Sequence, residues 1–222
     1  MIVSNRHSVV AREGRVFVAF GLLIVLALLL TFHIFSAVAF LLVTLILLFL
    51  YRDPVRFIPP SPLGVVSPVD GEVISISKEQ NTFTGREALR IGIQVSRLGV
   101  YSIRSPIEGK LIKQWRENQH ADSHYFNWVQ TDEGDNILWA ISAKTKNRAS
   151  CYVQPGERIG QGQRCGFILF FTAAELYVPA NSQINVSEGQ KIKAGESILA
   201  HIVHRHGASL IGDAILTAEN TG

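Results

Sequence analysis

The 222-residue chain contains very little sulfur, with only two cysteines and one methionine. Cys151 and Cys165 form no C-x-x-C pair, and this spacing indicates neither a zinc site nor a thioredoxin-like redox motif. We expect both cysteines to be reduced, buried thiols in a cytoplasmic domain, where disulfides are rare.

Charge is absent from a long N-terminal run. The 36 residues from Val16 to Tyr51 include no Asp, Glu, Lys or Arg. As one helix, this run would span about 54 Å, whereas the hydrocarbon core of a bilayer is about 30 Å thick. Two spans of about 17 residues each fit better. The polar and small residues between Thr31 and Ser36, with His33 among them, indicate a turn at the far interface.

Arginines flank the uncharged run on both sides, at positions 6, 12 and 15 before it and at positions 52 and 56 after it. Positive residues stay on the cytoplasmic side, and two spans return the chain to the side from which it started. We therefore predict a multi-pass protein of the inner (cytoplasmic) membrane with both termini in the cytoplasm. The expected parts are an N-terminal segment with a transmembrane hairpin, residues 1–52, and a domain of residues 53–222.

The pattern changes after a linker at residues 52–62, which contains four prolines and so favours extended chain over helix. Short stretches rich in β-branched residues follow, such as 72–76, 89–95 and 109–112. Gly, Pro, Asp and Asn separate them roughly every 8 to 12 residues, which is typical of a mainly β domain.

Two internal repeats refine this prediction. The first repeat comprises residues 67–74 and 105–112, which both read Ser-Pro, aliphatic, acid, Gly, charge and two aliphatics. The second repeat comprises residues 153–162 and 186–195, with glycines at matching offsets that suit turns with positive φ. Such hairpins predict a barrel-sandwich-like domain of the lipoyl or biotinyl type. The tips of the first repeat lack a carrier lysine, so we expect the architecture without the carrier function.

The order of these landmarks resembles the phosphatidylserine decarboxylase family, in particular its short membrane-anchored members. FLYRDPVRFIP at 49–59 resembles the family's F-F-R-D-P-x-R-x-x-P, and VVSPVDGEV at 65–73 resembles V-x-S-P-A-D-G-x-V. YSIRSPIEG at 101–109 resembles the C-terminal end of H-V-N-R-x-P-x-x-G. GFILFFT and ELYVP, between 166 and 179, resemble G-x-I-x-F-G-S and D-x-Y-x-P. With the tail at 186–199, the resemblance covers about residues 49 to 203.

The resemblance implies a self-processing chemistry. Family members cut themselves within the Gly-Ser pair, and the serine becomes a pyruvoyl group that accepts electrons as carbon dioxide leaves. In this sequence the family's Asp is Asp70, whereas Tyr101 stands at the position of its His. Phe171 and Thr172 replace the Gly-Ser pair. Arg104 stands where longer members have a second His and where short members normally have Arg.

These replacements have physical consequences. Thr172 could give only a 2-oxobutanoyl group, and Phe171 adds a Cβ and a ring where glycine allows a strained backbone. Tyrosine ordinarily titrates near pH 10, whereas histidine titrates near neutrality. We therefore predict an uncut relative without decarboxylase activity and without a pyruvoyl cofactor, which binds phospholipid or modulates a true decarboxylase. The alternatives are an active enzyme that makes phosphatidylethanolamine after atypical processing at Thr172, and a structural barrel-sandwich module without a lipid ligand.

Other candidate sites carry less information. The segment 86–116 holds seven Lys or Arg against two Glu, which indicates either a lipid-facing surface or a solvated one. Membrane phospholipid is the expected partner, together with a second copy of the chain or other phospholipid-synthesis proteins. Nucleic acid is not expected, because the charge excess is modest. His120 and His124 lie in a stretch that indicates a loop entering a strand, and no carboxylate or cysteine accompanies His201, His204 and His206 in their short segment, so we expect no metal. The expected lipid contacts are Arg97, Arg104, Lys110 and Lys113.

Overall fold

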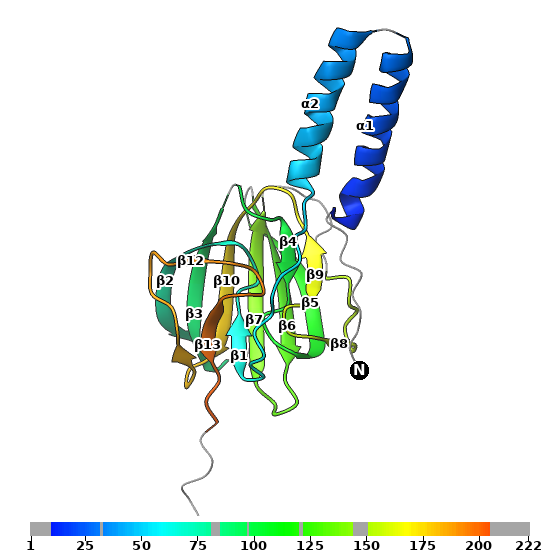
Figure 1. Cartoon of the computed structure of the whole chain (residues 1–222). Coiled ribbons are helices and arrows are strands. Elements are labelled where there is room, and N and C mark those ends of the chain that lie inside the picture. The colour runs from blue at the N-terminus through cyan, green and yellow to red at the C-terminus, as the bar shows by residue number, and fades with distance from the viewer. Residues whose placement is uncertain are drawn as a thin grey trace, which may run out of the picture.

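The computed structural model describes residues 10–31, 33–80, 85–96, 98–119, 122–143 and 151–204. Two helices, α1 (Arg12–Leu30) and α2 (Ile34–Leu50), form an antiparallel pair at one end of a β domain (Figure 1). The break between the helices falls inside the predicted turn. α1 is long and apolar enough to cross a membrane, whereas α2 is a shorter apolar helix of 17 residues. The predicted helix pair is confirmed, and a crossing of the membrane by both helices stays a prediction.

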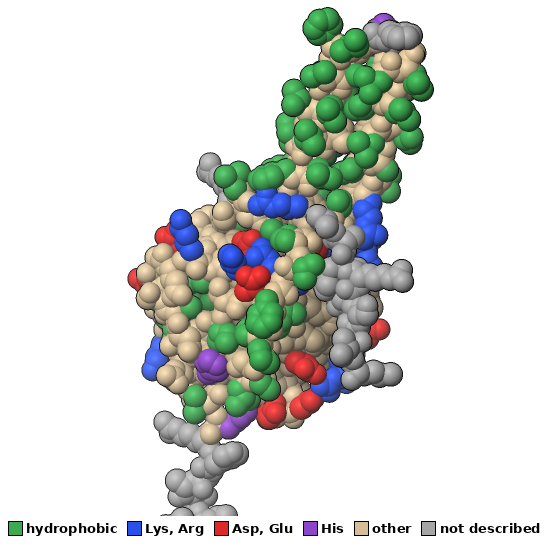
Figure 2. Space-filling view, in the orientation of Figure 1, with side chains coloured by type: hydrophobic (Ala, Val, Ile, Leu, Met, Phe, Trp, Pro, Cys, Tyr) green, Lys and Arg blue, Asp and Glu red, His purple; other side chains and the backbone are tan. Residues whose placement is uncertain are grey.

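Small side chains form the contact between the two helices. A Cβ atom added at Gly21 would lie 2.6 Å from Oγ1 of Thr44. The Thr44 hydroxyl donates a hydrogen bond to the carbonyl of Phe40 at 2.8 Å, so it is satisfied within its own helix. The large apolar side chains point outward over the whole visible surface of the pair (Figure 2). Small residues inside and apolar residues outside are typical of helices that pack within lipid.

Short strands build the rest of the described chain. In chain order they are β1 (Gly64–Val66), β2 (Gly71–Gln80), β3 (Glu87–Val95), β4 (Ser102–Arg104), β5 (Gly109–Gln119), β6 (Asp122–Gln130), β7 (Asn136–Ala143), β8 (Arg158–Ile159), β9 (Arg164–Phe167), β10 (Phe171–Pro179), β11 (Gln183–Ile184), β12 (Lys191–Ile192) and β13 (Ile198–His201). The strands expected near 72–76, 89–95 and 109–112 fall within β2, β3 and β5.

The largest sheet has the order β12-β2-β3-β10-β7-β6-β5-β8, and its neighbouring strands are antiparallel. It curls like half a barrel, and the smaller sheets β1-β13-β11 and β4-β9 lie against one face of it (Figure 1). This confirms the mainly β prediction with N-terminal helices. The narrower barrel-sandwich name stays a prediction.

Each copy of the first repeat pairs with one copy of the second. The amide of Gly156 donates to the carbonyl of Leu111 at 2.7 Å, and the amide of Gly189 donates to the carbonyl of Val73 at 2.8 Å. These are equivalent positions in the two copies. Two further matching bonds join Gly162 to Ser105 and Gly195 to Ser67, each at 2.8 Å. The repeats therefore mark two equivalent supersecondary units.

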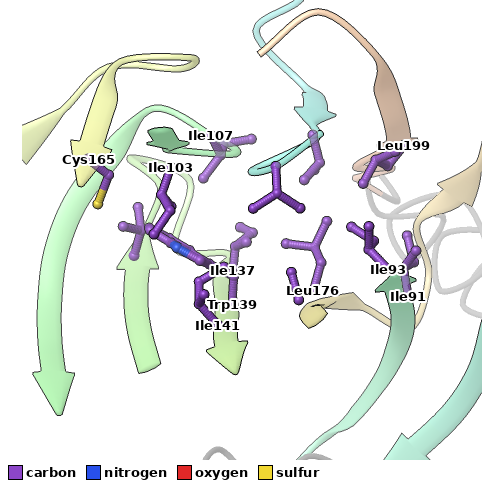
Figure 3. Close-up of a cluster of buried hydrophobic side chains, with 14 of the residues drawn as sticks. Ile91, Ile93, Ile103, Ile107, Ile137, Trp139, Ile141, Cys165, Leu176 and Leu199 are labelled. Atoms are coloured by element: carbon purple, nitrogen blue, oxygen red, sulfur yellow. The ribbon is translucent and has the colours of Figure 1, made fainter. Parts of the chain in front are cut away.

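The core lies between the large sheet and the two smaller sheets. Its side chains come from both layers and point toward one another, as Figure 3 shows for Ile103, Trp139, Leu176, Ile91 and Leu199. All five are buried. Alternate residues of the long strands reach this core, which is why the sequence alternates in short β-branched stretches.

The prediction of two reduced thiols is wrong in this structure. Cys151 and Cys165 form a disulfide, with Cα atoms 4.5 Å apart. The amide of Tyr152 donates to the carbonyl of Cys165 at 2.7 Å, which aligns the two segments side by side. Fourteen residues of separation gave no sign of this pairing, because it depends on where the chain returns after a loop.

Candidate functional site

Asp70 lies in the turn before β2 and is held by partners from three distant segments. Nη2 of Arg56 lies 3.0 Å from one carboxylate oxygen and 2.7 Å from the other. The amides of Val100 and Ala194 donate to the same carboxylate at 3.1 and 2.8 Å. With four donated bonds from three neighbours, the carboxylate fixes the linker, the β3–β4 loop and the segment after β12 to one point.

An aromatic cluster lies where the resemblance places the family's processing residues. The ring centroids of Tyr101 and Phe171 lie 5.8 Å apart in an edge-to-face arrangement, and those of Tyr101 and Phe170 lie 5.7 Å apart. Tyr101 and Phe171 are both 4% exposed. Such ring pairs are typical of a packed core, where they add about 0.5–1.5 kcal/mol beyond the burial of their area.

Thr172 lies at an irregular point of β10. Its neighbours Phe171 and Ala173 pair with consecutive residues of β7, which leaves Thr172 at a bulge. Its hydroxyl donates to the carbonyl of Ser142 at 3.3 Å, and its own carbonyl accepts a bond from Gln94 at 2.8 Å. Bulges occur next to active sites, where they re-aim a side chain.

The structure thus brings the four residues that the resemblance assigned, Asp70, Tyr101, Phe171 and Thr172, into one region. Tyr101, Phe171 and Thr172 meet where β9 continues into β10, and Asp70 joins them through Val100, the residue before Tyr101. Phe171 starts β10 at the end of the sheet that carries the helix pair (Figure 1). The candidate site therefore lies at the helix-bearing end of the domain.

A buried ion network that was not predicted from the sequence supports this site. Arg104 is 2% exposed and pairs with Asp53 at 3.3 Å, and it also donates to the carbonyl of Gly162 at 3.0 Å. The second oxygen of Asp53 lies 3.2 Å from Nε of Arg164. Arg164 in turn pairs with Glu13 of α1 at 2.8 Å. The network links the start of α1 to the domain.

Burial lowers the pKa of Arg104, and the neighbouring charge of Asp53 opposes that shift. A sequence signal for the network was the Arg-Asp-Pro-x-Arg run at 52–56, which was expected to be a linker and which also belongs to the first motif of the resemblance. In the structure its Asp53 binds Arg104 and its Arg56 binds Asp70, so the linker connects two of the motifs behind the resemblance.

The predicted lipid-binding residues do not form one surface. Arg104 cannot contact lipid because it is buried against Asp53, which corrects that prediction. Lys110 is exposed, but it pairs with Gln130 at the end of the sheet away from the helices (Figure 1). Lys113 lies over the ring of Trp115, 5.2 Å from its centroid. Arg97 lies outside the described residues.

Three of the described histidines, His124, His201 and His204, have side-chain partners within the β domain. His124 is 2.9 Å from the hydroxyl of Ser142, and His201 contacts Ser61 and Asn185 at 3.3 and 3.0 Å. Asp135 accepts from His204 and raises the pKa of that imidazole. His120 and His206 lie outside the described residues. Among the residues described, no three His, Cys, Asp or Glu side chains form a group that could hold a metal ion.

A charged trio lies on the large sheet. Arg90 pairs with one carboxylate oxygen of Glu175, and the hydroxyl of Tyr177 donates to the other at 2.8 Å. Burial alone would raise the pKa of Glu175, but the two hydrogen bonds together with the charge of Arg90 outweigh burial and lower that pKa. The trio is a structural feature of the sheet surface.

Comparison with known proteins gives a consistent answer. The sequence model of the phosphatidylserine decarboxylase family matches residues 44–200. The phosphatidylserine decarboxylase proenzyme of Nitrosomonas eutropha is 31% identical over 210 residues, which covers 87% of this chain and 95% of that protein. The proenzyme of Desulfotalea psychrophila is 32% identical over 207 residues, covering 87% and 97%. That of Burkholderia ambifaria is 31% identical over 212 residues, covering 88% and 97%. No solved structure matches the chain.

These relatives overturn the prediction that no cofactor belongs with this chain. They are proenzymes, and the pyruvoyl group is the cofactor of their family. The residues at this site do not fit a serine-derived pyruvoyl group, however. Thr172 has one methyl group more than serine, and the buried ring of Phe171 fills the neighbouring space. A threonine at this position would yield a 2-oxobutanoyl group instead.

Proposed function

Because the chain belongs to the phosphatidylserine decarboxylase family, we propose that it is a membrane-anchored relative that binds phospholipid, stays one uncut chain and does not decarboxylate its lipid. The packing of Tyr101 against Phe171 carries this proposal. These side chains stand at the positions of the family's histidine and of its cleavage-point glycine. Their rings lie 5.8 Å apart in the core, where a reactive centre would need room and mobility.

Self-cleavage requires the hydroxyl of residue 172 to attack the carbonyl of residue 171. The Thr172 hydroxyl instead donates to Ser142, and Gln94 holds the Thr172 carbonyl. Strand pairing fixes the backbone on the far side of Thr172, and the buried Phe171 ring fixes it on the near side. The acyl shift would therefore have to break strand contacts and displace a core side chain.

Proton transfer is a second difficulty for catalysis at this site. A general base needs a free lone pair within hydrogen-bonding reach of the proton that it takes. Asp70 already accepts bonds from Arg56, Val100 and Ala194. This pattern is typical of a turn carboxylate that fixes three segments, which supports a structural role for Asp70.

The membrane side of the proposal rests on the helix pair. We place both termini and the domain on the cytoplasmic side of the inner membrane, because arginines flank both ends of the pair. The disulfide between Cys151 and Cys165 favours the opposite placement, with the domain on the oxidising side of the membrane, because disulfides are rare in the cytoplasm. Membrane-impermeant thiol labelling of Asn5→Cys and Ile58→Cys in a Cys-free background tests the placement. Both sites should react only from the cytoplasmic side. Reaction of both from the other side would overturn the cytoplasmic placement, and reaction from opposite sides would refute the hairpin.

Intact mass of the purified full chain tests the main proposal. We expect one species of 24.5 kDa and no carbon dioxide release from phosphatidylserine. Two fragments with a new end at position 172 would overturn the proposal in favour of atypical processing. The comparison variant is Phe171→Gly with Thr172→Ser and Tyr101→His. It restores the family residues at all three positions and shows whether the surrounding scaffold still supports cleavage.

Lipid binding is tested separately by native mass spectrometry of the full chain from nanodiscs. We expect retained phosphatidylserine when the discs contain it together with phosphatidylcholine. A chain that emerges from these discs without bound phospholipid would contradict lipid binding and favour a structural module.

A further inference from the structure

Two loops at the helix-bearing end of the sheet present large apolar side chains to the outside. Leu98, in the loop between β3 and β4, is 71% exposed, and Phe170, between β9 and β10, is 55% exposed. Exposed apolar side chains are common singly. These two residues lie on neighbouring loops. Tyr101, three residues after Leu98, contacts the ring of Phe170 on the other loop.

Both loops contact the base of the helix pair. Arg52, just after α2, donates to the carbonyl of Leu98. The ring of Tyr51 stacks on Phe167, three residues before Phe170, with centroids 5.4 Å apart. Figure 1 shows the segment between β9 and β10 running across the end of the sheet beneath the helices. The loops are therefore at the level where the helix pair would enter a bilayer.

The residues around this level are those that favour a membrane interface. The Tyr51 ring also stacks on Phe17 of α1 at 6.0 Å, so aromatic rings run from helix to domain. Arg12 and Arg15 are exposed at the start of α1. Aromatic rings at headgroup level and arginines that meet lipid phosphates are the two usual features of such an interface.

The backbone of Phe170 supports a specific role for its outward position. Phe170 has φ of 58°, a left-handed conformation that is unfavourable for a bulky residue. Among the described residues other than glycine, it alone has a positive φ. This conformation keeps Phe171 in the core while Phe170 is largely exposed, and the rings of Phe170 and Tyr101 meet in an edge-to-face arrangement.

We propose that Leu98 and Phe170 insert into the headgroup–acyl boundary of the membrane in which the helix pair is anchored. The inference rests on the membrane anchoring in the proposed function, and it adds a second contact made by the domain itself. The bilayer is the occupant that the geometry favours, because the same loops are bonded to residues at the end of α2. As a consequence, the candidate site faces the lipid leaflet, and a phospholipid reaches it sideways without leaving the membrane.

Tryptophan replacements test this inference in the full chain. Leu98→Trp and Phe170→Trp are placed separately in nanodiscs of phosphatidylcholine and phosphatidylglycerol, with and without lipids brominated on the acyl chain. We expect brominated lipid to cause a loss of emission from both new tryptophans, with a blue-shifted maximum. The emission of Trp115, Trp128 and Trp139 is subtracted as the common background. An unchanged unfolding midpoint verifies the fold of each variant.

Two control positions separate the possible failures. Val203→Trp, 40% exposed and close to Asn181 at the other end of the domain, should not be quenched. Phe40→Trp, on the outside of α2, should be quenched strongly. If the probe at Phe40 is quenched but the probe at Leu98 or at Phe170 is not, the loop insertion is refuted and the membrane anchoring stands. Equal quenching of the probe at Val203 would refute the loop insertion in the same way. An unquenched probe at Phe40 would overturn the membrane anchoring and this inference with it.

Discussion

Replacing Asp53 by asparagine is expected to destabilise the domain far more than removing one charge from an exposed ion pair would. The change removes the negative partner of Arg104, which is 2% exposed, and leaves that guanidinium buried without a counter-charge. Breaking a buried ion pair from one side costs about 3–5 kcal/mol. For a chain of this size, each kcal/mol lowers the unfolding midpoint by about 2–4 °C, so we expect a drop of about 6–20 °C.

The assay is thermal unfolding of the full chain in detergent, followed by the fluorescence of the buried Trp139. The double variant Asp53→Asn with Arg104→Met removes both charges and should recover much of the lost stability, since hydrophobic replacement of a buried pair is often neutral. The matched control is Asp132→Asn, whose partner Arg158 is more than half exposed, and which should leave the midpoint unchanged. An unchanged midpoint for Asp53→Asn, or additive losses in the double variant, would refute the reasoning.

Three further predictions use other parts of the structure. Alkylation of the unfolded, unreduced chain should modify neither Cys151 nor Cys165, and reduction should expose both; free thiols before reduction would contradict the disulfide. The pKa of Glu175 is lowered because its hydrogen bonds and the charge of Arg90 together outweigh burial. Its stabilisation of the fold is therefore fully present at a pH above its ordinary pKa of 4.5, and it is lost as the pH falls through the pKa of the folded state. Glu175→Gln should therefore flatten the acid side of the stability profile measured by urea unfolding, and an unchanged slope would count against it. Gly195 has φ of 74°, and a Cβ added there would lie 2.9 Å from Cδ of Arg104. Gly195→Ala should therefore lower the free energy of unfolding by more than the cost of about 1–2 kcal/mol for a left-handed backbone at a residue with a side chain. Gly85→Ala, at φ 65° in open space, should cost only that penalty, and equal losses would show that the close contact is unimportant.

Local patterns in the sequence were enough to determine several features. The polar residues in the middle of the uncharged run predicted the position of the break between α1 and α2, since the polarity of neighbouring residues decides where an apolar helix can end. The β-branched stretches placed β2, β3 and β5 because strand alternation is a local property. The repeats indicated equivalent units, and the order of motifs identified the family. Each strand stretch and each motif is about ten residues long or shorter, which is the range over which side chains act through secondary structure.

Only the tertiary structure decided which distant residues meet. Arg104 is one of seven basic residues in its segment of sequence, and nothing in that segment shows that Asp53, 51 positions away, accompanies it into the core. Cys151 and Cys165 likewise meet only because the backbone around β9 returns beside Tyr152. Charge counted along a strand does not tell which face a side chain takes or which partner it finds. Those outcomes depend on the register and closure of the sheets, which contacts throughout the chain determine together.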